Sequence, residues 1–404
     1  MSDRLREQIK ERVLQRMDMS SVKSDEEVRE LIDACILEAD RDCYISYANK
    51  QRLVKEIFYA IRRLDFLQEL MEDPAVTEIM VNGAKKIFVE RNGSLYRMDR
   101  QFESKEKLED VVQQIVASCN RAVNEANPIV DARLSNGSRV NIVLPPVALN
   151  GPIITIRRFP EQPIDMQELI RLESLHSEAA DFLRKLVVAG YNIFISGGTG
   201  SGKTTFLNAL SQYIPVNERI ITIEDSAELQ LSSAENLVRL ETRNANAEGC
   251  HEITIRDLIR ASLRMRPDRI VIGEVRGSEA LDLIQALNTG HDGSLSTGHG
   301  NSARDMLYRL ETMVLMGMEL PLGAIRGQIA SGLDILIHLG RLRDRSRRVL
   351  EIVEILGCEA GMIRTHTLYR FEEKGEAADG RIQGELVKKE ELYRTDKLHS
   401  AGLS

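Results

Sequence analysis

The sequence predicts an α/β protein whose main domain holds a parallel, doubly wound sheet, preceded by a small α+β domain and an N-terminal helical bundle. Three observations predict this order. Apolar residues recur at helical spacing up to about residue 72, Asn-Gly hairpin signals follow up to about residue 160, and apolar strands then alternate with helices. The 404 residues exceed the roughly 250 to 300 at which a single hydrophobic core stops growing, so more than one domain is expected.

The first segment, residues 1–72, shows the spacing of amphipathic helices. One stripe places an apolar residue at every fourth position, namely Leu5, Ile9, Val13 and Met17. A second helix begins at Ser24, which forms a capping-box pattern with Glu27. A third helix is expected to end near Pro74 and carries Leu53, Ile57, Ile61 and Leu64. We predict a small helical bundle, with docking to a partner as the alternative role.

Residues 73–160 carry the signals of a small α+β domain. Asn92-Gly93 and Asn136-Gly137 each separate two short strand-like runs, which predicts two hairpins. The helix between them has one apolar face, formed by Leu108, Val111, Val112, Ile115 and Val116. A short strand ends the domain, and two prolines then indicate a linker over residues 161–174.

The segment Gly197–Thr205 reads GGTGSGKTT and lies between an apolar run and an amphipathic stretch. It meets the pattern G-x-x-x-x-G-K-[ST] of a phosphate-binding loop, in the strand–loop–helix context that this loop requires. Glycines let successive backbone N–H groups turn toward a phosphate, and Lys203 supplies positive charge. We therefore expect ATP or ADP here, with the hydroxyl of Thr204 on Mg²⁺. The predicted nucleotide-binding residues are Gly198, Thr199, Gly200, Ser201, Gly202, Lys203, Thr204 and Thr205.

Polar side chains follow three further apolar strands in the predicted main domain, residues 175–371. Glu224 and Asp225 end one strand, Glu274 the next and His299 the last. Ligands bind beyond the carboxyl ends of parallel strands, so these groups should gather beside the phosphate-binding loop. Hydrolysis of a phosphoanhydride needs a group that polarises water, and Glu274 is our candidate.

The other strand-end residues have candidate roles of their own. Glu224 is expected to contact the metal or its water, and Asp225 is a candidate Mg²⁺ ligand because that ion prefers oxygen. His299 is a candidate sensor of the terminal phosphate, since imidazole donates a hydrogen bond in either protonation state. The alternative for the acidic residues is an exposed strand-end charge or a helix cap, and a lone histidine is usually structural.

Four arginines precede the main domain and are candidates to bring positive charge to the terminal phosphate. They are Arg133, Arg139, Arg157 and Arg158. Such an arrangement would couple hydrolysis to the motion of a domain or subunit. The alternative is that each of them forms a salt bridge at a domain interface.

Composition limits the classes of protein that remain. The net charge of −8 argues against a general nucleic-acid binder, so no direct contact with nucleic acid is expected. The sequence has neither a run of about 18 apolar residues nor a secretory signal at its start, which predicts a cytoplasmic protein. Five scattered cysteines indicate neither disulfides nor a zinc site. A basic run over residues 341–348 is predicted to be a solvated turn between two strands.

Four motifs in fixed order resemble those of the type II/IV secretion and pilus motor ATPases. They read GGTGSGKTT, ITIEDSAEL, LRMRPDRIVIGEVRG and NTGHDGSLSTGHGNS, and correspond to the Walker A motif, Asp box, Walker B motif and His box. The upstream segment DARLSNGSRVNIVLPPVALNGPIITIRRF is similar to the CpaF branch, which assembles Tad/Flp pili. The likeness spans roughly residues 60 to 365. The sequence departs from the family pattern at the glycines around His299, and it lacks the tetracysteine module of type II secretion members.

The resemblance implies a RecA-like ATPase domain and a ring of six subunits that powers pilus assembly at the inner membrane. Glu224 then matches the Asp-box acid, Glu274 the Walker B glutamate and His299 the His-box histidine, while Arg157 and Arg158 match the family's upstream arginines. The implied partners are identical subunits and inner-membrane pilus platform proteins, with the chain peripheral at the inner face of the membrane.

Two alternative functions stay open. One is a type IV secretion motor that moves protein or DNA, and the other is an ATP-switched scaffold that does not hydrolyse. Residues 372–404 are expected to form a peripheral hairpin or tail, without chemistry.

Overall fold

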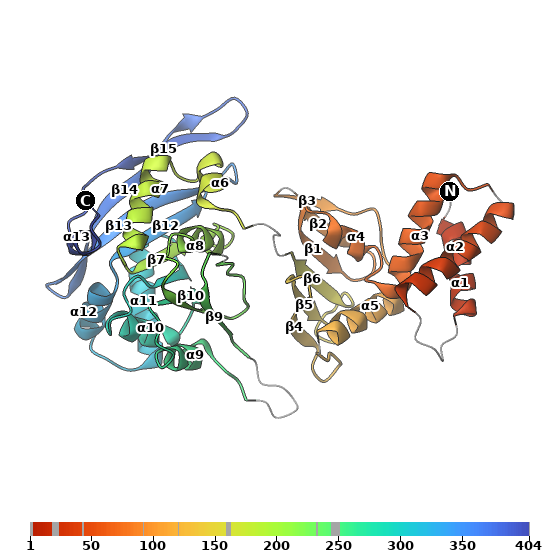
Figure 1. Ribbon diagram of the computed structural model, residues 1–404, viewed down its shortest axis with the longest axis horizontal. Helices are drawn as coiled ribbons and strands as arrows, with labels where there is room; N and C mark the ends of the chain where they lie inside the picture. Colours follow the sequence, from red (N-terminus) through yellow and green to blue (C-terminus); the bar gives the residue numbers. More distant parts are fainter. Residues whose placement is uncertain are drawn as a thin grey trace. The chain divides into compact units, whose positions relative to one another are not determined.

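The chain divides into two compact units, Met1–Glu161 and Gln162–Ser404 (Figure 1). The computed structural model describes residues 3–17, 24–42, 44–91, 93–119, 121–158, 163–231, 233–243 and 251–403. None of the helices within these ranges is both long and apolar enough to cross a bilayer.

The first unit begins with three helices that share one apolar core. They are α1 (Asp3–Arg16), α2 (Asp25–Asp42) and α3 (Tyr47–Arg62). Ser24 Oγ accepts a hydrogen bond from the Glu27 backbone at 3.2 Å, and the Ser24 backbone donates to the Glu27 carboxylate at 2.6 Å. The predicted capping box is therefore confirmed. The core includes Ile9, Val13, Val28, Ile32 and Ile57.

The predicted third helix is shorter than expected. It ends at Arg62, because the following Arg63 has extended backbone and Asp65 adopts a positive φ of 55°. The chain then forms the separate helix α4 (Leu67–Glu72), which packs on the sheet that follows rather than on the bundle. Phe66, just before α4, stacks on Phe102 with ring centroids 4.8 Å apart. The extension to Pro74 was wrong, since helical spacing alone does not reveal a break of four residues.

A six-stranded antiparallel sheet covered by α5 (Lys105–Ser118) completes the first unit. Its strand order is β3-β2-β1-β6-β5-β4. The strands are β1 (Val76–Asn82), β2 (Ile87–Arg91), β3 (Ser94–Arg97), β4 (Ile129–Arg133), β5 (Arg139–Val143) and β6 (Ile153–Arg157). Both predicted hairpins are present, as β2–β3 and β4–β5. The five residues predicted for the apolar face of α5 are all buried.

The second unit is built on a nine-stranded sheet of order β15-β14-β13-β12-β7-β11-β10-β8-β9. Six strands form its parallel part: β7 (Ile193–Gly197), β8 (Arg219–Glu224), β9 (Asn236–Glu241), β10 (Arg269–Val275), β11 (Leu295–His299) and β12 (Ile335–Arg341). Three antiparallel strands extend it: β13 (Arg347–Glu359), β14 (Met362–Glu376) and β15 (Ile382–Lys388). The sheet is therefore mixed, whereas the sequence predicted a parallel one.

Helices cover both faces of this sheet, as expected for a doubly wound fold. One apolar cluster joins it to α6 (Met166–Arg171), α7 (Ser177–Val188) and α8 (Lys203–Ser211). A second cluster joins it to α9 (Ile255–Ser262), α10 (Glu279–Leu287), α11 (Ala303–Gly317) and α12 (Leu322–Gly332). Neighbouring residues of β7 divide between them, since Ile193 and Ile195 pack in the first cluster and Phe194 in the second.

The C-terminal segment is part of the second unit. Strand β14 crosses residue 371, where we placed a domain boundary, and its hairpin with β15 projects at the sheet edge (Figure 1). The chain then returns along the sheet to α13 (Asp396–Ser400). Glu354, which is 1 % exposed, accepts hydrogen bonds from the backbones of Tyr393 (2.8 Å) and Arg394 (2.7 Å). Lys397 pairs with the buried Asp334 at 2.7 Å.

We expect Glu354→Ala to lower the free energy of unfolding by about 2 to 4 kcal/mol, because it removes a buried carboxylate that accepts two part-buried backbone hydrogen bonds. His366, whose Nε2 lies 2.9 Å from the Glu354 carboxylate, also loses that neighbour. Urea unfolding measures the loss, and limited proteolysis should cut the variant first near residue 393. Glu359→Ala, on the same strand but with a side chain 67 % exposed, serves as the control. Equal stability of the two variants would show that Glu354 does not anchor the C-terminal segment.

Candidate active site

The predicted phosphate-binding loop lies between β7 and α8, in the second unit. Gly200 (φ 71°) and Gly202 (φ 93°) adopt left-handed backbone, which only glycine reaches without strain. Gly202 is the N-cap of α8, and Lys203 is its first residue. The Lys203 ammonium donates to the carbonyls of Gly197 (3.1 Å) and Gly198 (3.0 Å). The loop therefore holds its lysine at the start of a helix, where an anion is stabilised.

The structure brings the strand-end residues together in a continuous series of contacts. Lys203 Nζ lies 3.4 Å from His299 Nδ1, within hydrogen-bonding distance. His299 Nε2 lies 2.8 Å from Glu274 Oε1, but this second contact lacks the alignment of a hydrogen bond. Arg276 donates to Glu274 Oε2 at 2.7 Å and lies 3.3 Å from Asp225. These residues lie on, or follow, the carboxyl ends of four adjacent strands, in the order β7-β11-β10-β8. The expected gathering at the carboxyl edge of the sheet is seen for these residues.

Burial shapes the electrostatics of this series. It lowers the pKa of Lys203, and the nearby Glu274 carboxylate opposes that shift. Burial also lowers the pKa of His299, which Glu274 again opposes while Lys203 and Arg276 add to it. Both shifts disfavour the charged forms in the absence of a ligand, and a negatively charged ligand beside these groups would stabilise those charged forms.

Glu224 is almost fully buried, at 3 % exposure. Its Oε1 accepts hydrogen bonds from the backbones of Glu228 (2.8 Å) and Leu229 (2.9 Å), while Oε2 is buried without a hydrogen-bond partner among the described residues. Burial raises the pKa of Glu224 to about 7, although the two backbone bonds oppose this. A Cβ atom at Gly273 would lie 2.9 Å from the Glu224 side chain. Gly273 therefore makes room for the Glu224 side chain.

The free energy of unfolding should fall as pH rises from about 4.5 to 7, by as much as about 3 kcal/mol from Glu224. The sign follows because the folded protein binds this proton more tightly than the unfolded chain. Glu224→Gln, which carries no charge, should remove this part of the pH dependence. Thermal unfolding without nucleotide at pH 5 and pH 8 measures the difference. An identical pH dependence in wild type and variant would contradict the raised pKa.

The residues present fit a nucleoside triphosphate with Mg²⁺. The left-handed glycines and Lys203 suit a phosphate chain, and Thr204 follows Lys203 in the first turn of α8. The unpartnered Glu224 Oε2 suits a water molecule on a metal ion. Within the described ranges, no group of three or more His, Cys, Asp or Glu side chains forms a metal cluster. A magnesium ion would therefore depend on Thr204 and on phosphate oxygens.

Arg276 and Arg347 are two site residues that the sequence analysis missed. Arg276 contacts two of the predicted acids, so Asp225, predicted as a metal ligand, is paired with an arginine. Arg347 donates to the carbonyl of Gly200 at 2.9 Å, although we expected the basic run to be a solvated turn. The turn itself is confirmed at residues 342–346, whereas Arg341 lies in β12 and Arg347 and Arg348 lie in β13. The positive charge of the run was a sequence signal that could have indicated Arg347. The contact of Arg347 with the loop, however, depends on the order of the strands.

The four upstream arginines lie in the first unit. Arg158 donates to the carbonyls of Asp73 and Val76, the latter at 3.0 Å, and so ties the end of β6 to the start of β1. Arg157 has a side chain that is 61 % exposed, with Glu78 3.9 Å away. Arg133 and Arg139 face each other across the β4–β5 hairpin, and Arg133 donates to the Gly137 carbonyl at 3.2 Å. Arg157, the last residue of β6, is thus exposed, whereas Arg158, which follows the strand, stabilises the fold.

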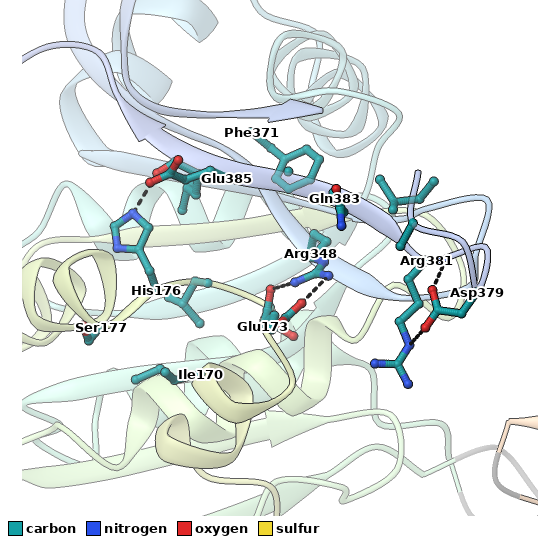
Figure 2. Close-up of a pocket in the computed structure, with 16 residues that line it drawn as sticks. Ile170, Glu173, His176, Ser177, Arg348, Phe371, Asp379, Arg381, Gln383 and Glu385 are labelled. Carbon is teal, nitrogen blue, oxygen red and sulfur yellow. Dashed lines mark hydrogen bonds and ion pairs between the residues drawn. The ribbon is translucent and has the colours of Figure 1, made fainter. Parts of the chain in front are cut away.

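A cavity of about 670 Å³ lies beside the β14–β15 hairpin and contains none of the predicted site residues (Figure 2). Arg348 lines it and donates to the Glu173 carboxylate at 2.9 Å, as the dashed lines show. Its neighbour Arg347 bonds instead to the phosphate-binding loop. Ser174 connects the two places, because its hydroxyl donates to the Arg347 carbonyl at 2.9 Å. Two neighbouring residues of β13 therefore contact the phosphate-binding loop and the cavity wall, respectively.

Known relatives match most of this chain. A family model described as "Type II/IV secretion system protein" matches residues 62–389. The chain is 34 % identical over 304 residues to the type IV secretion system protein PtlH of Bordetella pertussis, which covers 69 % of this chain and 89 % of that protein. It is 31 % identical over 318 residues to the conjugal transfer protein TrbB of Rhizobium radiobacter, which covers 78 % and 94 %.

Solved structures share the fold. The crystal structure of the pilus retraction motor PilT with bound ADP matches with a TM-score of 0.52 at 19 % identity, and covers 83 % of this chain and 86 % of that one. The X-ray structure of the ATPase DotB of Yersinia pseudotuberculosis matches with a TM-score of 0.53 at 18 % identity, and covers 74 % and 79 %. At such identities these likenesses bear on fold alone. They confirm the predicted fold class, with a RecA-like domain after a smaller α+β domain and N-terminal helices.

Proposed function

The chain belongs to the type II/IV secretion system protein family, and on this premise we propose that it is an ATP-hydrolysing motor of a secretion or pilus system. The observation that carries the proposal is the contact series Lys203–His299–Glu274–Arg276. It sets a phosphate-binding lysine at the start of α8 beside a histidine and a carboxylate on two adjacent strands, as phosphoanhydride hydrolysis requires. An ATPase was the predicted enzyme class, and the family agrees with it.

The residues divide the work as follows in this proposal. Lys203 and the backbone N–H groups of residues 198–204 hold the phosphates, and Thr204 holds Mg²⁺, which neutralises phosphate charge when bound. Glu274 accepts a hydrogen bond from the attacking water and so orients it. His299 links the carboxylate to Lys203 and thereby senses the terminal phosphate. Glu224 would offer its unpartnered oxygen to water around a bound metal ion.

We propose that the exposed Arg157 contacts the terminal phosphate and that Arg133 and Arg139 supply further positive charge. Arg158 would hold the backbone beside Arg157 in place. Because these residues belong to the first unit, their approach would couple hydrolysis to the movement of that unit. Six subunits would form a ring at the inner face of the cytoplasmic membrane and act on a pilus platform protein. The specific proposal is a motor that assembles Tad/Flp-type pili, with retraction as a second use.

Two measurements on the purified protein test this function, namely its ATP turnover and its molecular mass in solution. We expect the purified full-length chain to release phosphate from ATP with Mg²⁺, and to assemble into a hexamer with a non-hydrolysable nucleotide. A monomer under all nucleotide conditions would count against the ring. Phosphate release at background level in wild type, unchanged by Glu274→Gln, would instead identify a nucleotide-switched scaffold.

A second candidate function is a type IV secretion motor that moves protein or DNA. It is favoured by relatives named for type IV secretion and for conjugal transfer. Direct contact with DNA should show as an affinity that falls steeply with salt concentration. We expect no such affinity, because the net charge of the chain is −8. A salt-dependent affinity for DNA in the purified protein would favour this second function.

A further inference from the structure

Arg276 occupies a position between two acids that belong to different strands. It follows β10 directly, and its guanidinium reaches Glu274 Oε2 at 2.7 Å and Asp225 Oδ2 at 3.3 Å. Asp225 follows β8, the neighbour of β10 in the sheet. Because a guanidinium is planar and offers several donors in fixed directions, two such contacts restrict its orientation. The guanidinium therefore connects the ends of two adjacent strands.

The backbone around Arg276 is held as well as its side chain. The backbone N–H groups of Arg276 and Gly277 both donate to Glu279 Oε1, at 2.6 and 2.8 Å. Glu279 is the first residue of α10, so the turn after β10 is tied to a helix. The arginine thus reaches its two acids from a backbone of defined position.

Glu274 has neighbours on both of its carboxylate oxygens. His299 lies 2.8 Å from Oε1, and Arg276 donates to Oε2. The Glu274 side chain is 18 % exposed, whereas that of Arg276 is 60 % exposed and adjoins a cavity of about 480 Å³. Arg276 therefore lies between the Glu274 carboxylate and solvent, on the side of Glu274 that faces Asp225. We infer that Arg276 is a positioning residue for Glu274, and that Asp225 anchors Arg276.

This inference rests on the proposed function, because it concerns how Glu274 orients water. A carboxylate that is displaced by about 1 Å loses the geometry needed to orient its water, and such a displacement costs up to about 100-fold in rate. Nucleotide binding depends instead on the loop and on Lys203. Loss of Arg276 should therefore lower kcat and leave affinity for nucleotide nearly unchanged.

The first test compares variants of the full-length protein in steady-state ATP hydrolysis and in binding of a fluorescent ADP analogue. We expect Arg276→Ala to lower kcat by about ten- to a hundred-fold, with a Kd within about two-fold of wild type. Arg276→Lys should recover part of the loss, and Asp225→Asn should lower kcat by less than Arg276→Ala. Arg304→Ala, an exposed arginine at the start of α11, is the matched control and should leave kcat unchanged.

The second test is a double-mutant cycle with Glu274→Gln. If Arg276 acts through Glu274, adding Arg276→Ala to Glu274→Gln should lower kcat no further. Multiplicative losses would overturn the inference, and so would a Kd that weakens as much as kcat falls. Wild-type protein without ATP turnover would overturn both the proposed function and this inference. Normal turnover in Arg276→Ala would overturn this inference alone.

Discussion

Lys203→Ala is expected to lower ATP turnover by at least about a hundred-fold and to weaken nucleotide binding strongly. The Lys203 ammonium lies at the start of α8, bonded to two loop carbonyls and beside His299. Alanine removes that charge at the position where the phosphates would sit. Phosphate release and titration with a fluorescent ADP analogue measure the two effects.

The nucleotide-free Lys203→Ala protein should remain folded. Burial already lowers the pKa of Lys203, so its charged form gains little from the fold without a ligand. Circular dichroism and thermal unfolding test this, and Lys374→Ala, with a side chain 60 % exposed, is the control for a lost surface charge. Normal turnover in the Lys203→Ala variant would refute the assignment of the loop.

Glu274→Gln is expected to lower kcat by about 100- to 1,000-fold while ATP stays bound. Glutamine keeps the shape of the side chain and can accept the hydrogen bond from Arg276, but its neutral amide is a much weaker acceptor for water. Single-turnover hydrolysis with tight nucleotide binding should reveal a protein that holds ATP and cleaves it slowly. The exposed Glu319 offers a matched control as Glu319→Gln.

The result that would contradict this role is specific. If Glu274→Gln abolished nucleotide binding with the fold intact, Glu274 would hold the metal or the loop rather than a water molecule. If kcat stayed within about two-fold of wild type, the carboxylate would have no part in hydrolysis.

Much of the site was predictable because it depends on local order along the chain. The glycines and Lys203 of the loop are consecutive in sequence, and Glu224, Glu274 and His299 each end an apolar strand. Parallel strands bring their carboxyl ends to one edge, so the gathering of these residues followed from fold class alone. The glycines around His299 also have a clear reason, since a Cβ at Gly298 would meet the Phe194 ring at 2.9 Å.

The contacts of Arg276 and Arg347 were not predictable in the same way. Arg276 meets Asp225 only because β8 and β10 are neighbours, although about fifty residues separate them in the chain. Arg347 meets the loop because β12 lies beside β7 and turns back into β13. Strand order is set by the packing of both sheet faces at once, which no local pattern contains.

The amino-acid sequence was therefore sufficient for the elements that repeat a short period and for motifs of adjacent residues. It predicted the loop, the strand ends and the hairpins, because each is encoded within about 30 residues, and it predicted the family, because each of the four motifs is itself short. Packing in three dimensions assigned α4 to the α+β core, joined β14 and β15 to the main sheet, and brought Arg276 to Asp225. These features depend on contacts between distant parts of the chain, whose free energies are balanced only in the complete fold.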